Sequence, residues 1–477
     1  MGWYAVACLM MLLGTPDPAP ALSPTPAEYP AGVLIDPVVS GSDPTQRYVL
    51  YLPKTVDLKT PRPILYVMDY RGRGRFAAEL FQPAAERLGW IIMSSYNTAS
   101  DRAGAPNASA LQAMWRDSHD RFTIDDRRTY LAGLSGTARM ATLIAGQSGA
   151  PIAGVIGAGA GFPPDVPPSK EISFLYYGTA GTIDYNYWEM RSLDVQLTRL
   201  GKPHRIAFFD GPHAWMPPEL AMAALCWMEL RAMQAGQRGI DRELVQERWT
   251  RDLDRSQTLE AGGLVWEASQ LLKAMAGDYA GLRPAEEIAE TAARADRLAK
   301  TLDGVRQAEL LRRAAFDHDA RVHRRLQIIA AAFPKTAEEP AITLAQTIWN
   351  LDIAKLRDAA RAQSEDALAA ARVLAQLQVQ TGFYLPEAAL ADGEYEHARF
   401  YLGIAEAIDP NEPYSWYLRS AVEARQKRFD QAVAALKRAV ALGFRTLDAV
   451  EHDPAFDALR QRSDFAAVVD ELRAKRD

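Results

Sequence analysis

Short apolar runs alternate with amphipathic stretches through the first half of the chain. The runs have the length of strands and are rich in β-branched and aromatic residues, whereas the stretches between them repeat apolar residues at helical spacing. The predicted strands cover residues 33–38, 47–52, 61–69, 90–95, 130–132, 152–158, 172–178 and 205–209. The main predicted helices cover residues 76–88, 108–122, 187–200 and 217–236. This alternation predicts an α/β fold whose mostly parallel sheet is covered by helices on both faces.

The alternation stops at residue 237. The rest of the chain shows no convincing strand pattern and is rich in Ala, Leu, Glu and Arg at helical spacing, as between Glu286 and Leu311. The second half is therefore predicted to be all-α. We divide it into a helical region, residues 237–380, and a region of helical repeats with a C-terminal cap, residues 381–477.

A period of 34 residues marks the repeat region. Tyr395, Ala398, Leu402 and Ala405 recur as Phe429, Ala432, Leu436 and Ala439. This pattern resembles the tetratricopeptide repeat (TPR), in which paired helices pack small residues against large ones. Two such units bury little surface alone, so we expect the preceding helices and the tail to cap them. An irregular helical domain is the alternative.

The most specific chemical pattern lies between Thr129 and Ala141. An apolar run leads through Gly133-Leu134-Ser135-Gly136-Thr137 into a helical stretch. A serine between small residues at a strand-to-helix turn is typical of the nucleophile elbow, where a strained backbone exposes the hydroxyl. Ser148 also has glycine neighbours, but it follows a helix and reads as part of a helix-ending loop. We predict that Ser135 is a nucleophile; a tight turn without chemistry is the alternative.

A serine nucleophile requires a base, and in this type of fold the chain order is serine, acid, histidine. Among the seven histidines, His213 directly follows a strand, on a loop after Gly211 and Pro212. His204 precedes the same strand, so we expect it at the opposite edge of the sheet. The remaining histidines lie upstream of Ser135 or in the helical half: His119, His318, His323, His397 and His452. We therefore predict that His213 is the base.

Asp184 is the favoured acid. It follows the strand 172–178, which comes just before the strand that leads to His213. Asp210 and Asp165 are alternatives, although Asp210 is too close to His213 along one loop to face it easily. Asp184 also suits the N-cap of the helix that begins near residue 187.

The tetrahedral intermediate of acyl transfer needs two N–H donors. One is predicted to be the backbone of Gly136, the residue after the nucleophile. The other should come from the loop after the strand 61–69, where Tyr70 and Arg71 are both candidates. Trp215 and Tyr185 are candidate substrate-binding residues, and packing is the equally weighted alternative for both.

Residues 33–236 resemble the α/β-hydrolase superfamily, and within it the esterases related to polyhydroxybutyrate depolymerases and feruloyl esterases. The resemblance is carried by Gly133-Leu134-Ser135-Gly136-Thr137-Ala138-Arg139, Asp184-Tyr185-Asn186-Tyr187 and Gly211-Pro212-His213-Ala214-Trp215. It implies ester hydrolysis through an acyl-enzyme, without a metal or organic cofactor. The chain departs from the family at Thr137, where many members have glycine, and at Asp69-Tyr70-Arg71-Gly72, which replaces a His-Gly pair.

Composition and the N-terminus bear on location and partners. The net charge of −6 and the absence of a basic patch with interleaved aromatics argue against nucleic acid. An apolar segment followed by Ala19-Pro20-Ala21 predicts a signal peptide, residues 1–21, and a flexible N-terminal segment, residues 22–32. We therefore expect a periplasmic or secreted bacterial protein without stable membrane insertion after cleavage.

The sequence thus predicts a serine esterase that acts on a small-molecule or polymeric ester and whose helical repeats bind a protein or peptide. One alternative is a peptidase of the prolyl-oligopeptidase type, although no propeller-like run of strands precedes the hydrolase region. Another is a binding protein, in which the hydrolase fold is a non-catalytic platform and the helical repeats bind a protein partner.

Overall fold

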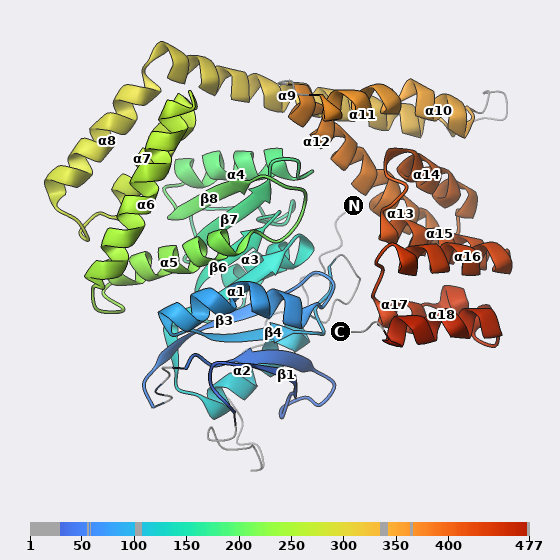
Figure 1. Cartoon of the computed structure of the whole chain (residues 1–477), viewed down its shortest axis with the longest axis horizontal. Coiled ribbons are helices and arrows are strands. Elements are labelled where there is room, and N and C mark those ends of the chain that lie inside the picture. Colours follow the sequence, from blue (N-terminus) through green and yellow to red (C-terminus); the bar gives the residue numbers. More distant parts are fainter. Residues whose placement is uncertain are drawn as a thin grey trace. The chain divides into compact units, whose positions relative to one another are not determined.

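The computed structural model describes residues 29–474 except 55–56, 58, 101–106, 334–341 and 363–365. The predicted signal peptide and residues 22–28 of the predicted N-terminal segment lie outside this range. The chain divides into two compact units, the first reaching Arg312 and the second beginning at Arg313 (Figure 1).

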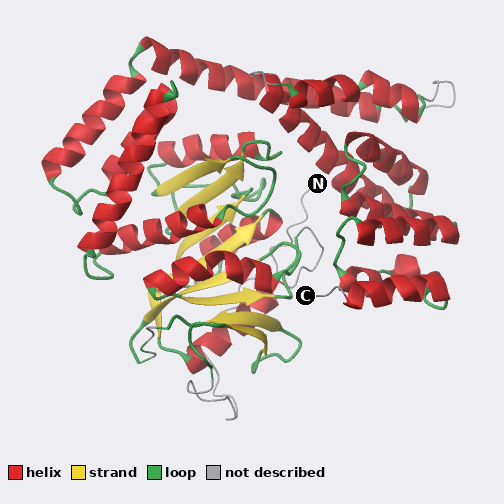
Figure 2. Cartoon of the chain, in the orientation of Figure 1, coloured by secondary structure: helices red, strands yellow, loops and turns green. Residues whose placement is uncertain are grey.

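The first unit is built on one eight-stranded sheet (Figure 2). Its strands are β1 (Leu34–Val39), β2 (Arg47–Tyr51), β3 (Arg62–Met68), β4 (Ile91–Ser95), β5 (Ile124–Leu134), β6 (Ile152–Ala158), β7 (Leu175–Gly181) and β8 (His204–Phe209). The strand order is β1-β2-β4-β3-β5-β6-β7-β8. The first two strands pair antiparallel to their neighbours, and all pairs from β4 to β8 are parallel.

Helices cover both faces of this sheet. They are α1 (Gly74–Leu88), α2 (Asn107–Arg121), α3 (Gly136–Gln147), α4 (Tyr187–Arg199) and α5 (Pro218–Gln234). One buried core joins α1 and α5 to the face that carries Leu65, Val67 and Ala132. A second core joins α2, α3 and α4 to the opposite face, which carries Ile64, Tyr66 and Leu131. The alternation of faces along β3 and β5 is the period of two expected of strands. This arrangement is the α/β-hydrolase fold, so the predicted fold class is confirmed.

One predicted strand is displaced. The apolar run 172–178 indicated a strand there, but β7 spans Leu175–Gly181. Phe174 is buried because it stacks on Phe162 rather than because it belongs to the sheet. The small residues Thr179, Ala180 and Gly181 continue the ladder with β8 instead.

Three further helices belong to the first unit. They are α6 (Arg242–Ala261), α7 (Val265–Asp278) and α8 (Ala285–Ala299). Their apolar residues share a core with Cys226, Leu230 and Met233 of α5. Arg205 of β8 forms ion pairs with Asp252 of α6 at 2.9 Å and with Asp278 of α7 at 2.8 Å. The compact unit therefore extends past residue 236, and the predicted helical region 237–380 is divided between the two units.

The second unit is helical throughout its described residues. Helix α9 (Leu302–Ala330) begins in the first unit and continues into the second. It is followed by α10 (Leu344–Asn350), α11 (Ile353–Arg361), α12 (Asp366–Val379), the π-helical turn Gln380–Tyr384, α13 (Leu385–Ala391), α14 (Tyr395–Ile408), α15 (Pro413–Arg425), α16 (Phe429–Ala441), α17 (Leu447–His452), the 3-10 turn Pro454–Leu459 and α18 (Ser463–Ala474). Helices α14 and α16 begin 34 residues apart, at Tyr395 and Phe429. The repeated positions Ala398 and Leu402 are fully buried, as are Ala432 and Leu436.

Candidate active site

Ser135 lies at the sharp turn between β5 and α3. Its backbone angles are φ 60° and ψ −127°, a left-handed conformation that costs a side-chain-bearing residue about 1–3 kcal/mol. A Cβ at Gly133 would stand 2.5 Å from the backbone of Thr137 and Ala138, so only glycine fits where the strand meets the helix. The Ser135 N–H donates to the carbonyl of Ala158 on β6 at 2.9 Å. The surrounding structure thus holds the strained residue that the sequence pattern predicted.

Thr137, which stands where glycine is common in the family that the sequence resembles, anchors this turn. Its hydroxyl donates to the carbonyl of Met68 at 2.6 Å and accepts the N–H of Leu134 at 3.0 Å. Met68 is the last residue of β3, and the loop expected to supply an oxyanion donor starts directly after it. A glycine at position 137 would lack this link between the nucleophile turn and that loop.

His213 and Asp184 form a buried pair at the carboxyl ends of β7 and β8. The Nδ1 atom of His213 lies 2.8 Å from Oδ1 of Asp184, which also accepts the N–H of Asn186 at 2.7 Å. The Asp184 carboxylate is fully buried, and the His213 side chain is 12% exposed. Backbone hydrogen bonds from Thr182 to Phe209 and from Ile183 to Gly211 hold the two loops together.

The alternative residues lie elsewhere. Asp210 accepts a hydrogen bond from Thr182 at 3.1 Å, and Asp165 is exposed on the loop after β6. Ser148 is the C-cap of α3, the helix-ending position that its sequence context indicated. His204 is the first residue of β8 and pairs with Asp194, at the other end of the strand from the His213 loop.

Gly159, which the sequence analysis missed, supports the pair from behind. It adopts φ +64°, and a Cβ there would lie 2.6 Å from Cε1 of His213 and 3.0 Å from Oδ2 of Asp184. Its carbonyl accepts a hydrogen bond from the Asn186 side chain at 2.7 Å. The only signal in the sequence is its position directly after a strand, which many loop glycines share.

Tyr185 covers the histidine. Its ring stacks on His213 with the centroids 4.1 Å apart, and its hydroxyl lies 3.5 Å from Oγ of Ser135. The Nε2 atom of His213 is buried and has no hydrogen-bond partner among the described residues. No hydrogen bond between Ser135 and His213 is therefore formed in this structure. Such bonds are often long without substrate and tighten when it binds.

Asp69 organises the loop after β3. Its buried carboxylate accepts the backbone N–H groups of Arg71 and Arg73, two N–H groups of the Arg73 guanidinium, and the indole N–H of Trp215 at 2.8 Å. Burial alone would raise the pKa of Asp69, but the hydrogen bonds from Arg73 and Trp215 and the charge of Arg73 hold that pKa below its ordinary value. The Arg71 N–H is thus used by Asp69, whereas the Tyr70 N–H has no acceptor among the described residues.

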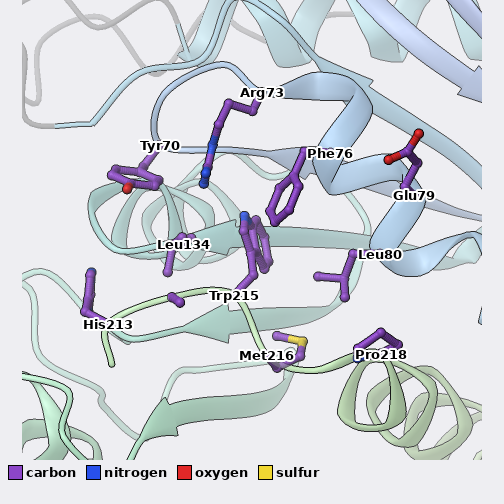
Figure 3. Close-up of a pocket in the computed structure, with 11 residues that line it drawn as sticks. Tyr70, Arg73, Phe76, Glu79, Leu80, Leu134, His213, Trp215, Met216 and Pro218 are labelled. Carbon is purple, nitrogen blue, oxygen red and sulfur yellow. The ribbon is translucent and has the colours of Figure 1, made fainter. Parts of the chain in front are cut away.

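A pocket of about 400 Å³ opens between this loop and His213 (Figure 3). Trp215 forms its centre and packs edge-on against Phe81, with the ring centroids 5.7 Å apart. Tyr70 and Leu134 lie on the side nearer His213, and Phe76 and Leu80 lie on the other. Of the two predicted substrate-binding residues, Trp215 lines this pocket, whereas Tyr185 lies against the histidine.

The described residues of the chain contain no cluster of histidine, cysteine, aspartate and glutamate suited to a metal ion. None of their helices combines the length and the hydropathy needed to cross a membrane.

The structure is similar to several solved hydrolases. An S-formylglutathione hydrolase from Staphylococcus aureus aligns at 15% identity over 41% of this chain and 96% of that chain, with a TM-score of 0.33. An esterase from Pyrobaculum calidifontis aligns at 14% identity over 43% and 88%, with a TM-score of 0.34. An acylaminoacyl peptidase from Pyrococcus horikoshii aligns at 13% identity over 40% and 39%, with a TM-score of 0.29. No protein-family model and no curated protein matches the sequence.

Proposed function

We propose that this protein is a serine hydrolase that cleaves carboxylic esters through an acyl-enzyme. The observation that carries the proposal is the buried Asp184–His213 pair, 2.8 Å apart, on loops at the same sheet edge as the strained Ser135. Acyl transfer through a serine needs a nucleophile, a base and an acid, and the chain order serine, acid, histidine at these strand ends is the one typical of α/β-hydrolases.

In the proposed mechanism, Oγ of Ser135 attacks the ester carbonyl carbon while Nε2 of His213 takes the serine proton. Asp184 holds the Nδ1–H tautomer and stabilises the imidazolium. The N–H groups of Gly136 and Tyr70 stabilise the oxyanion; Tyr70 is preferred to Arg71 because the Arg71 N–H donates to Asp69. The imidazolium then protonates the departing alcohol. Water, deprotonated by His213, hydrolyses the acyl-enzyme and releases Ser135.

Two aromatic residues are proposed to contact the substrate. The ring of Trp215 packs against the part of the ester that enters the pocket, because Trp215 lines it. Tyr185 lies over His213 with its hydroxyl near Oγ of Ser135, so the attacked carbonyl must pass beside it. In this proposal, substrate entry displaces the Tyr185 hydroxyl and lets His213 close on the serine.

The test is covalent labelling by a fluorophosphonate probe. Wild type and Ser148→Ala are expected to label, and Ser135→Ala is not. Ser148 is the matched control because it is a serine at the other end of the same helix, α3. A folded wild type that does not label, or labelling that survives Ser135→Ala, would overturn the proposal.

Labelled wild type is then given matched ester and peptide substrates with the same acyl group. Faster turnover of the esters is expected. Preferred cleavage of the peptides would move the assignment to the peptidase alternative, with the same nucleophile.

We propose in addition that the second unit recruits a protein or peptide and that the enzyme acts outside the cytoplasm of a bacterium. The support is the 34-residue spacing of α14 and α16, which is typical of TPR-like repeats, and the apolar N-terminal segment of the sequence. Affinity capture with the full chain and with a chain shortened after residue 312 tests the first point. A partner retained by the shortened chain would contradict it. Cell fractionation tests the second point, and a cytoplasmic full-length protein would contradict it.

A further inference from the structure

The pocket beside His213 is mostly apolar. Its walls are aromatic and aliphatic side chains: Tyr70, Phe76, Leu80, Leu134, Trp215 and Met216. Besides His213 and Tyr70, its ionisable lining residues are Arg73 and Glu79. Sites of this composition bind an apolar group and use a few placed polar atoms for selection. Of these lining residues, only Arg73 carries a permanently charged group that can donate a hydrogen bond.

The guanidinium of Arg73 is held in place on three sides. It lies 5.2 Å from the ring centre of Tyr70 and 4.8 Å from that of Phe76. Its Nε and Nη2 atoms donate to the two oxygens of Asp69 at 3.1 and 2.9 Å. Figure 3 shows the side chain descending between Tyr70 and Phe76 toward Trp215.

One nitrogen of this guanidinium is unused. Nη1 has no hydrogen-bond partner among the described residues, and the Arg73 side chain, which lines the pocket, is 42% exposed. A preorganised donor next to an apolar wall discriminates strongly, because a ligand without an acceptor leaves it unpaired once water is displaced.

The charges around the pocket favour a neutral acceptor. Asp69 already offsets the charge of Arg73. Glu79 adds a second carboxylate to the lining, although it pairs with Arg75 at 2.9 Å. A substrate carboxylate would thus join two protein carboxylates around one pocket cation, whereas an ether or carbonyl oxygen adds no charge.

We propose that Arg73 is a specificity residue whose Nη1 donates a hydrogen bond to a neutral ether or carbonyl oxygen in the apolar part of the ester that fills the pocket. The substrate class is therefore an ester of an oxygen-substituted, otherwise apolar acid or alcohol. This inference rests on the proposed function.

The test compares substrates that differ by one atom. In the first series, 4-nitrophenyl heptanoate is compared with analogues in which an ether oxygen replaces the methylene at carbon 4, 5 or 6. In the second series the same chains form the alcohol part of acetate esters. The readout is the ratio of kcat/KM for the best ether to kcat/KM for the hydrocarbon within one enzyme, which is independent of the fraction of active protein.

Wild type is expected to prefer an ether over the hydrocarbon by about tenfold in one of the two series. Arg73→Leu is expected to reduce that ratio to about one, even where the variant is less stable. Arg87→Leu is the matched control: Arg87 is a partly exposed arginine in the last turn of α1, pairs with Glu247 and does not line the pocket, so its ratio should equal that of wild type.

Three outcomes overturn the inference. One is a wild-type ratio of about one in both series, and another is a preference that survives Arg73→Leu. The third is a higher kcat/KM for the 4-nitrophenyl monoester of adipic acid, which ends in a carboxylate, than for the best ether. In each case esters are still cleaved, so the proposed function stands. If wild type cleaves none of these esters, the proposed function fails, and the inference fails with it.

Discussion

At the scale of single residues, the site depends on groups that carry out no chemistry themselves. Gly159 makes room for the His213–Asp184 pair, and Thr137 ties the nucleophile turn to β3. The buried carboxylate of Asp69 accepts hydrogen bonds from donors on two different loops. Each of these residues holds other groups of the site in place. Each can therefore be tested by a substitution that keeps the three proposed catalytic side chains.

Gly159→Ala is expected to reduce activity with little loss of fold. The new methyl group would stand 2.6 Å from Cε1 of His213, and displacing a catalytic group by a fraction of an ångström to one ångström costs about a hundredfold in kcat/KM. Gly149→Ala is the control because Gly149 has a similar φ of +71° and nothing within 4 Å of the added methyl. Left-handed strain should lower the free energy of unfolding of both variants by about 1–2 kcal/mol, and Gly159→Ala adds the cost of displacing His213. Equal kcat/KM values for the two variants would refute the role given to Gly159.

Asp69→Asn is expected to lower the free energy of unfolding at neutral pH by about 2–3 kcal/mol, because hydrogen bonds to a charged acceptor are lost. The pKa of Asp69 is lowered in the folded protein, so its contribution is complete above the unfolded pKa of about 3.9 and is lost as pH falls through the lower folded value. The difference between wild type and variant should therefore shrink below about pH 4. Urea titrations across this range measure it, and a difference that stays constant down to acid unfolding would contradict this account.

At the scale of elements, the strands and the nucleophile turn were predictable because their signals are local. The apolar runs at β3, β4 and β6 lie within two residues of the observed strands, and Gly133 to Thr137 predicted the strained serine. The displaced β7 shows the limit: Phe174 is buried by contact with another loop, and sequence pattern cannot distinguish that from burial in a sheet.

The parts of the site that escaped prediction depend on residues far apart in the chain. Asp69 and Trp215 are 146 positions apart and meet through one hydrogen bond. Gly159 faces His213 because β6 and the loop after β8 converge at one sheet edge. Trp215 was predicted as a substrate-binding residue, but nothing in the local sequence indicated its hydrogen bond to Asp69 or the position of Gly159.

The ion pairs of Arg205 are expected to matter for stability. Burial raises the pKa of Asp278; burial would also raise that of Asp252, but Arg205 and Arg248 hold it below its ordinary value. Arg205→Met would leave both carboxylates buried without this partner, at a cost of about 3–5 kcal/mol in the free energy of unfolding. Arg294→Met breaks the more exposed pair with Glu260 and should cost less than about 1 kcal/mol. Urea unfolding compares them, and similar losses would count against the Arg205 network.

At the scale of the whole molecule, the first compact unit includes helices beyond the sheet and the five helices that cover it. Helix α5 shares a core with α6, α7 and α8, and β8 is ion-paired to α6 and α7. The strand that leads to His213 is therefore braced by helices that follow it in the chain.

A chain shortened after residue 312 is expected to remain soluble and to be labelled at Ser135 at nearly the wild-type rate. A chain shortened after residue 236 should aggregate, because it exposes the apolar face of α5 and leaves Arg205 without its carboxylates. Size-exclusion chromatography and probe labelling distinguish the two. A well-behaved, labelled shorter fragment would show that the later helices are dispensable.

The shared carboxylate of Asp69 has a consequence for any redesign of this pocket. The same group fixes Trp215 on one wall of the pocket and the loop that begins at Tyr70 on the other. Enlarging the pocket at Trp215 thus also loosens the loop proposed to stabilise charge during the reaction. Under the proposed function, substrate selectivity and reaction rate are therefore coupled, and variants with a larger pocket will need compensating changes on both walls.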